Sequence, residues 1–224
     1  MKKLVAAIIA AALLLSGCTS TVQPAESARP TAAAPSPTPI PGATPTPEPA
    51  DDELVLICDY IPGIFIDLKY ATTDNFTGQV IYDSDEAYLR YGTVKKLLSA
   101  QNELSGRGLS LKIWDAYRPV SAQFKLWEIC PNPVYVSNPN NGYSKHSRAN
   151  TVDITLVTST GESIPMPSGF DDFTSLADRD YSDVSAEAAE NSRLLESVMV
   201  ENGFVPYSGE WWHYSDSVSY DVYE

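Results

Sequence analysis

The chain has 224 residues and a formal net charge of −14 at pH 7. Three of its 15 basic residues and two of its 29 acidic residues precede residue 51, so the segment from 51 to 224 holds 12 basic and 27 acidic side chains. We therefore expect no nucleic-acid partner, because binding nucleic acid requires a basic face.

The start of the chain has the pattern of an export signal. Two lysines precede an uninterrupted apolar run over residues 4–15. As a helix this run would be about 18 Å long, too short for a roughly 30 Å hydrocarbon core. Ser16, Gly17 and Cys18 follow directly and resemble a bacterial lipobox, where the chain is cut just before a lipidated thiol. We predict a lipoprotein signal peptide at residues 1–17 and a lipid on Cys18 that anchors the chain outside the cytoplasmic membrane. An ordinary secretory signal that contains a Cys is the alternative.

The segment after the signal predicts a linker. Residues 19–50 contain repeated Pro and Thr, a composition that favours extended polyproline II conformation and cannot bury a core. We therefore expect residues 18–50 to be the lipidated Cys and its spacer. Residues 51–224 have the length of one domain.

The first half of this domain predicts two helices with a strand between them. Residues 93–105 carry apolar side chains at helical spacing, with Thr93 as a candidate N-cap and Gly106 as a stop. Residues 109–114 alternate between two faces, which predicts a strand. Residues 119–129 predict a short helix that opens on its proline.

The second half predicts a loop, a strand, a long helix and a returning strand. Residues 131–142 are rich in turn formers, 152–157 are rich in β-branched residues, and 159–183 are irregular. Residues 185–202 have helical apolar spacing, and 204–214 return as strand and turn. Because helices and strands do not alternate regularly, we expect an α+β fold with a mainly antiparallel central sheet flanked by helices.

Two cysteines, Cys58 and Cys130, lie within the domain. Outside the cytoplasm they can form one disulfide, or they can remain buried free thiols. Both alternatives stay open, because a disulfide depends on the distance between the two Cα atoms.

The chain has two histidines, His146 and His213, and each has a carboxylate nearby in sequence. Two His and one Asp form a three-ligand set that leaves zinc an open position. His146 and Asp153 are too far apart for one helical turn, so a bend between them is needed. Glu210 and His213 are three residues apart, and a straight strand would point them to opposite faces. A turn or bulge around Trp211 is therefore required for both to face one ion.

Four motifs follow one another between residues 61 and 214. They are Tyr-Ala-Thr-Thr-Asp-Asn-Phe-Thr-Gly at 70–78, Asp-Ala-Tyr-Arg-Pro at 115–119, Ser-x-His-Ser-Arg at 144–148 with Asp153, and Glu-Trp-Trp-His at 210–213. Together they resemble the VanX-type D-alanyl-D-alanine dipeptidases. These zinc peptidases share a fold group with D-alanyl-D-alanine carboxypeptidases and the hedgehog signalling domain. The resemblance implies that fold, one Zn²⁺ per chain, and a zinc peptidase domain over residues 51–224.

The resemblance also assigns roles to the residues of these motifs. It makes His146, Asp153 and His213 the zinc ligands. Glu210 is expected to be the catalytic acid/base, which takes a proton from water and passes it to the departing amine. Arg118 is expected to stabilise the polarised carbonyl and its oxyanion.

Two further residues match positions that hold the ends of the dipeptide. They are Ser144 and Asp171, and Asp171 is the expected partner of the substrate ammonium. Each assignment has a simpler alternative. Arg118 can form a salt bridge at a helix start, and Glu210 can orient a ligand. Trp211 and its neighbour Trp212 are expected to pack and to form a pocket wall.

One position departs from the family pattern. Family members commonly have Gly after the His-Ser-Arg run, where this chain has Ala149, Asn150 and Thr151. If that position needs a positive φ, Ala costs about 1 kcal/mol. Asn150 is the residue that can take this conformation instead.

These observations leave three functional hypotheses. The first is a dipeptidase that cleaves free D-Ala-D-Ala in cell-wall peptide metabolism. The second is a carboxypeptidase or endopeptidase that acts on peptidoglycan stem peptides. The third is a zinc-stabilised binding module without catalysis. The motifs favour the first hypothesis, the export signal favours the second, and the presence of Glu210 and Arg118 argues against the third.

Overall fold

The computed structural model describes residues 47–223. The predicted signal peptide at 1–17, the predicted lipid site Cys18, and the linker up to residue 46 lie outside the described residues. Within the described part, no helix combines the length and the apolar character needed to span a membrane.

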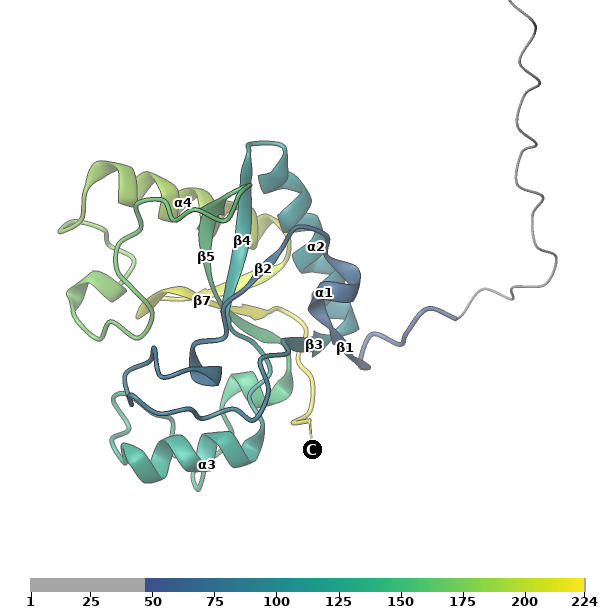
Figure 1. Cartoon of the computed structure of the whole chain (residues 1–224), viewed down its shortest axis with the longest axis vertical. Helices are drawn as coiled ribbons and strands as arrows, with labels where there is room; N and C mark the ends of the chain where they lie inside the picture. The colour runs from purple at the N-terminus through teal and green to yellow at the C-terminus, as the bar shows by residue number, and fades with distance from the viewer. Residues whose placement is uncertain (1–46, 224) are drawn as a thin grey trace, which may run out of the picture. The chain divides into compact units, whose positions relative to one another are not determined.

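A five-stranded sheet forms the centre of the domain (Figure 1). Its strands lie in the order β2 (Phe65–Ile66), β4 (Leu109–Asp115), β5 (Thr151–Thr158), β7 (Glu210–Asp216) and β6 (Phe204–Tyr207). The β2–β4 pair is parallel, whereas β4–β5, β5–β7 and β6–β7 are antiparallel. The predicted α+β fold with a mainly antiparallel sheet is therefore confirmed.

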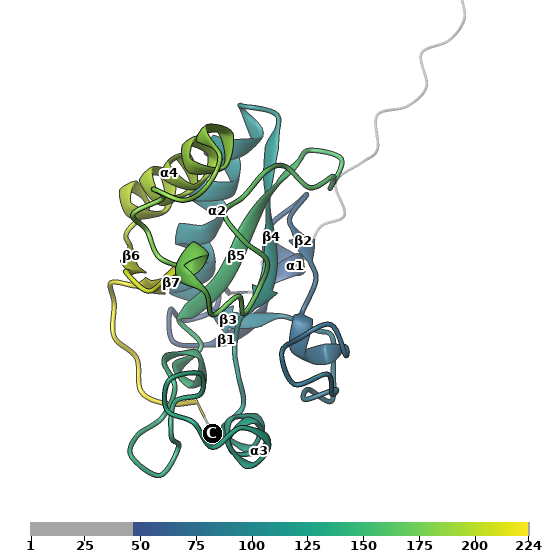
Figure 2. The ribbon, with the colours of Figure 1, turned by 90° about the vertical axis from the view of Figure 1, so that its left-hand side faces the viewer.

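Two long helices, α2 (Tyr91–Ser105) and α4 (Ala186–Glu201), pack against each other and against the sheet. Figure 2 shows both on the same side of β4 and β5. A third helix, α3 (Val120–Ile129), lies at the other end of the domain (Figure 1). The opposite face of the sheet is therefore not covered by α2 and α4.

The remaining elements are short. Helix α1 (Ile57–Tyr60) follows β1 (Leu54–Leu56), which pairs with β3 (Tyr88–Arg90) in a two-stranded sheet. Single 3₁₀ turns occur at η1 (Lys69–Ala71), η2 (Lys145–Arg148) and η3 (Ser175–Ala177). The turn η3 is one regular element within the segment 159–183 that the sequence predicts to be irregular.

The core follows the apolar periodicity of the sequence. On β5, alternate residues Val152, Ile154 and Leu156 belong to the hydrophobic core, and Asp153 points to the opposite face. The helices contribute apolar side chains at three- and four-residue spacing. Those fully or almost fully buried include Val94, Leu97 and Leu104 of α2 and Leu195, Val198 and Met199 of α4.

The helix ends correct two predictions. The long helix begins at Tyr91, so the prediction of Thr93 as its N-cap is wrong. Thr93 instead donates a hydrogen bond to Asp216 from inside the helix. Pro119 is the N-cap of α3 and not a residue of its first turn. The last helix runs from Ala186 to Glu201, within one residue of the predicted 185–202 at each end, and the Ser185 hydroxyl caps its start by accepting from the Ala188 N–H at 3.2 Å.

Within residues 47–223, Cys58 and Cys130 are free thiols. Cys58 is exposed and Cys130 is half-buried, so the disulfide alternative is not supported, and neither thiol is buried.

Candidate active site

One row of residues across the sheet places three polar side chains together. Asp153 on β5 lies opposite Asp115 on β4 and opposite His213 on β7. Directly opposed residues of antiparallel strands point to the same face. A register shift between Ile113 and Asp115 allows this alignment on β4. Two carboxylates and an imidazole therefore share the face opposite the core.

The second imidazole, that of His146, lies on the turn η2. Ser144 caps this turn by accepting from the His146 N–H, and Ala149 ends it in the left-handed region with φ 57°. The His146 Nδ1–H donates to the Ala116 carbonyl at 2.9 Å. This bond fixes the tautomer and leaves Nε2 to face Asp153, 3.4 Å from its carboxylate.

The three predicted ligands converge. Donor atoms of His146, Asp153 and His213 all lie within 4.8 Å of one another. The nearest pair is His213 Nδ1 and Asp153 Oδ1, at 2.9 Å. His146 and Asp153 are buried and His213 is partly buried. Two imidazole nitrogens and one carboxylate are a donor set that zinc prefers in sites with an open position, so the residues fit the implied metal.

The charges of this cluster are coupled. Burial opposes ionisation of Asp153, but His146 and His213 hold its pKa well below the usual range. Burial likewise opposes protonation of His146, but Asp153 and Asp115 raise its pKa. The site therefore favours positive charge, as a cation site should.

Glu210 joins the cluster through a bulge. The register between β6 and β7 pairs Pro206 with Tyr214 but Tyr207 with Glu210, so β7 carries extra residues at this step. This irregularity brings the Glu210 carboxylate to 3.4 Å from His213 Nδ1. The predicted bulge is thus present. Burial, followed by the charge of Asp153, raises the pKa of Glu210, which makes it a stronger base.

Arg118 is held beside the cluster by a buried carboxylate. Its Nε and Nη2 donate to Asp115 at 3.2 and 2.5 Å, and its Nη1 donates to Gln123 at 2.9 Å. Its guanidinium also stacks over the Tyr70 ring, 5.0 Å from the centroid. A guanidinium has five N–H donors, so among the described residues one donor on each terminal nitrogen has no acceptor. The alternative of a salt bridge near the helix start is also present, since Asp115 is three residues away.

The comparisons with known proteins agree with this geometry. Residues 50–221 match the model of the peptidase M15 family, described as D-Ala-D-Ala dipeptidase. The chain is 38% identical over 162 residues to the D-alanyl-D-alanine dipeptidase of Escherichia coli K12, covering 72% of this chain and 83% of the relative. It is 35% identical over 176 residues to the enzyme of the same name from Enterococcus faecium, covering 70% and 87%.

The chain belongs to the M15 dipeptidase family. A solved structure of VanYB in complex with D-alanine-D-alanine is also similar, at 16% identity and a TM-score of 0.41, covering 59% of this chain and 74% of that one. Members of the M15 family are zinc metallopeptidases, in keeping with the donor set of His146, Asp153 and His213.

The two predicted substrate residues lie on different segments. Ser144 is buried at the start of η2, where its oxygen accepts from His146 and its proton remains available. Asp171 accepts from the Tyr70 hydroxyl at 2.8 Å. Tyr70 therefore connects Asp171 with Arg118, which stacks on the same ring.

Asp171 has two unusual properties. Its φ is 53°, which is uncommon for a residue other than Gly. Burial is the main cause that raises the pKa of its carboxyl to about 8. Together with Phe76 and Phe170 it lines a cavity of about 430 Å³. A carboxylate in such surroundings gains stability when a cation binds beside it.

Ala149 stands where family members commonly have Gly, and it has a positive φ. Ala149 itself adopts the left-handed conformation and is fully buried. The expectation that Asn150 takes this conformation is wrong. The strain of about 1 kcal/mol therefore falls on Ala149.

Three residues of the site were not among those predicted from the sequence. Asp115 holds Arg118 and lies 3.6 Å from His146 Nδ1, Tyr82 donates to Asp115, and Gln123 accepts from Arg118. Asp115 had a signal, since it stands three residues before Arg118 in the same motif. Tyr82 had none in the sequence. Trp211 and Trp212 are both buried, as expected for packing residues.

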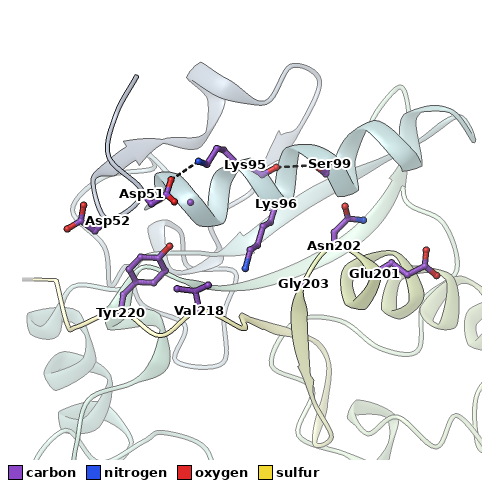
Figure 3. Close-up of a pocket in the computed structure, with 11 residues that line it drawn as sticks. Asp51, Asp52, Lys95, Lys96, Ser99, Glu201, Asn202, Gly203, Val218 and Tyr220 are labelled. Carbon is purple, nitrogen blue, oxygen red and sulfur yellow. Dashed lines mark hydrogen bonds and ion pairs between the residues drawn. The ribbon is translucent and has the colours of Figure 1, made fainter. Parts of the chain in front are cut away.

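A separate cavity of about 680 Å³ does not include the site. It lies beside α2 and the C-terminal end of α4 (Figure 3). None of the predicted site residues lines it. Its two lysines are already paired, Lys95 with Asp51 at 2.6 Å and Lys96 with Asp216 at 2.5 Å.

Proposed function

We propose that this chain is a zinc-dependent peptidase that cleaves free D-alanyl-D-alanine outside the cytoplasmic membrane. The observation that carries the proposal is the convergence of His146, Asp153 and His213, with Glu210 beside them, in a chain of the M15 family. Relatives at 35–38% identity are named for this reaction.

The site residues divide the work of peptide hydrolysis. When bound to His146, Asp153 and His213, zinc supplies Lewis acidity at the scissile carbonyl. Glu210 takes the proton of the attacking water and later delivers it to the departing amine. The two free N–H donors of Arg118 stabilise the oxyanion, and its bonds to Asp115 fix their direction.

Asp171 selects a substrate with a free ammonium. Its partly buried carboxylate pairs with that ammonium in place of solvent, with Tyr70 holding it in position. An N-acylated peptide brings a neutral amide to the same position. Without a cation beside it the Asp171 carboxyl has a pKa of about 8 and is mostly protonated at neutral pH, so the charge-assisted bond to an ammonium is not formed. Hydrogen bonds to charged groups contribute about 1.5–3 kcal/mol, so free dipeptide is preferred to an extended chain.

Substrate size tests the proposed reaction. The purified chain should cleave D-Ala-D-Ala far faster than N-acetyl-D-Ala-D-Ala or a stem pentapeptide. Asp171→Asn should narrow this gap by harming the dipeptide. The matched control is Asp172→Asn, because Asp172 is the adjacent carboxylate and bonds to Thr174 in an exposed turn. If the wild-type chain prefers the acetylated or longer peptide, a wall carboxypeptidase or endopeptidase is the better assignment.

The location is a separate part of the proposal. It is supported by the apolar run at residues 4–15 and the small residues before Cys18. A lipid on Cys18 would hold the peptidase at the membrane surface, where it can recover dipeptide released from the cell wall. Cys18→Ser should release the protein from the membrane fraction. If the variant still fractionates with membranes as wild type does, lipidation is not the anchor.

A further inference from the structure

Arg179 is not one of the site residues described above, and each nitrogen of its guanidinium donates hydrogen bonds. It lies between η3 and α4, and its side chain is 10% exposed. Its Nη1 donates to Glu196 and to the Tyr214 hydroxyl, both at 3.0 Å. Its Nε donates to the Tyr207 carbonyl at 2.7 Å, and its Nη2 donates to the carbonyls of Glu210 and His213 at 3.0 and 3.1 Å. All five of its N–H groups are therefore used.

The three carbonyls lie at the irregular step between β6 and β7. Tyr207 is the β6 residue next to the register shift, and the stretch of β7 from Glu210 to His213 contains the residues that the shift passes over. One nitrogen of Arg179 bonds the carbonyls at both ends of this stretch. Arg179 thus joins the two ends of a bulge that regular strand pairing does not hold together.

This bulge sets the direction of two site residues. Side chains alternate between faces along a regular strand, so residues three apart point to opposite sides. Glu210 and His213 are three apart, yet their side chains approach to 3.4 Å. If the bulge relaxed towards regular strand geometry, Glu210 would turn away from His213.

We infer that Arg179 is a positioning residue that holds the β7 bulge and thereby sets Glu210 and His213 toward one ion. The inference rests on the proposed function for the role of Glu210. Arginine suits this task because its planar fork serves several acceptors in fixed directions, and Glu196 and the Tyr214 ring hold the fork in place. A lysine ammonium has three donors at one point and cannot serve the same five acceptors.

The test compares Arg179→Gln, Arg179→Lys and a control, Arg193→Gln. Arg193 is a neighbouring exposed arginine on α4 that stacks on Tyr181 at 5.4 Å. Zinc affinity is measured by chelator competition without substrate, kcat and KM are measured with D-Ala-D-Ala at saturating zinc, and thermal unfolding is followed for each variant. Arg179→Gln should lower both zinc affinity and kcat by about 10- to 100-fold. KM should change little, because Asp171 and Arg118 are held by other contacts.

Three outcomes would overturn the inference. One is zinc affinity or kcat at the wild-type level in Arg179→Gln, even if its unfolding temperature falls, because Arg179 would then only support the fold. Another is an equal loss in Arg193→Gln. If Arg179→Gln does not fold, Arg179→Lys decides, and wild-type zinc affinity in that variant contradicts the inference. If wild type does not cleave D-Ala-D-Ala, the proposed function fails, but the zinc measurement still decides the role of Arg179.

Discussion

Replacing Asp115 with Asn tests how the fold holds Arg118, the residue proposed to stabilise the oxyanion. The Asp115 side chain is fully buried and the Arg118 side chain is 11% exposed. Asn has nearly the same shape, but it is neutral and one carboxylate oxygen becomes an NH₂ group that cannot accept from Arg118. Both bonds from Arg118 to Asp115 end on the same oxygen, Oδ2.

The burial of the pair sets the size of the effect. Removing one partner of a buried ion pair leaves the other charge uncompensated and costs about 3–5 kcal/mol. A natural domain has a free energy of unfolding of about 5–15 kcal/mol, so Asp115→Asn should remove a large part of it. The same change should lower kcat, since Arg118 loses the bonds that aim its free donors.

Urea unfolding in excess chelator measures this cost without a contribution from metal binding. Glu103→Gln is the matched control, because Glu103 forms a 3.1 Å ion pair with Arg107 at the surface. Exposed pairs of this kind contribute about 0.3–0.5 kcal/mol. An Asp115→Asn variant that loses no more free energy of unfolding than Glu103→Gln would refute the reasoning.

Three further predictions concern the metal cluster and its protons. The chain should bind about one zinc ion, and His146→Ala or His213→Ala should remove it. The metal content is measured by mass spectrometry, and full metal content in either variant contradicts the ligand set. Glu210→Gln should reduce kcat by about 10²–10⁴-fold while zinc is kept, and a parallel loss of zinc would make Glu210 a ligand. The pKa values of His146, Asp171 and Glu210 are all raised in the folded chain without metal, whereas the pKa of Asp153 is lowered. Above the ordinary pKa of an aspartate, Asp153 is ionised in both states, so the folded state there binds more protons than the unfolded state and its stability should fall as pH rises. The contribution of Asp171 to the free energy of unfolding changes between pH 3.8 and about 8. Asp171→Asn should therefore flatten the dependence of this free energy on pH, measured by urea unfolding. An unchanged dependence would argue against the burial of Asp171.

Local patterns predicted most of the regular structure. The helix over 185–202 and the strand over 109–114 were found within a few residues, because apolar periodicity and caps act between near neighbours in sequence. The start of α2 was misplaced because Thr93 finds its partner in Asp216, 123 residues away. No local signal carries such a contact.

The sequence by itself determined the chemistry available to this protein. Two histidines, a nearby aspartate and the four motifs sufficed to predict the candidate metal ligands, the candidate base and the family. Requirements of covalent geometry also predicted the bulge between Glu210 and His213, since a regular strand separates residues three apart.

Only the tertiary structure decided how these groups are held. Asp115 meets Tyr82 across 33 residues, Asp171 meets Tyr70 across 101, and Arg179 reaches the carbonyls of the β7 bulge from another segment. Each of these contacts depends on where the folded chain brings distant segments together. Burial then strengthens the electrostatic interactions between the charged groups. The sequence predicts the candidate metal ligands and the candidate base, and the packing of distant segments sets the directions of these side chains and their pKa values.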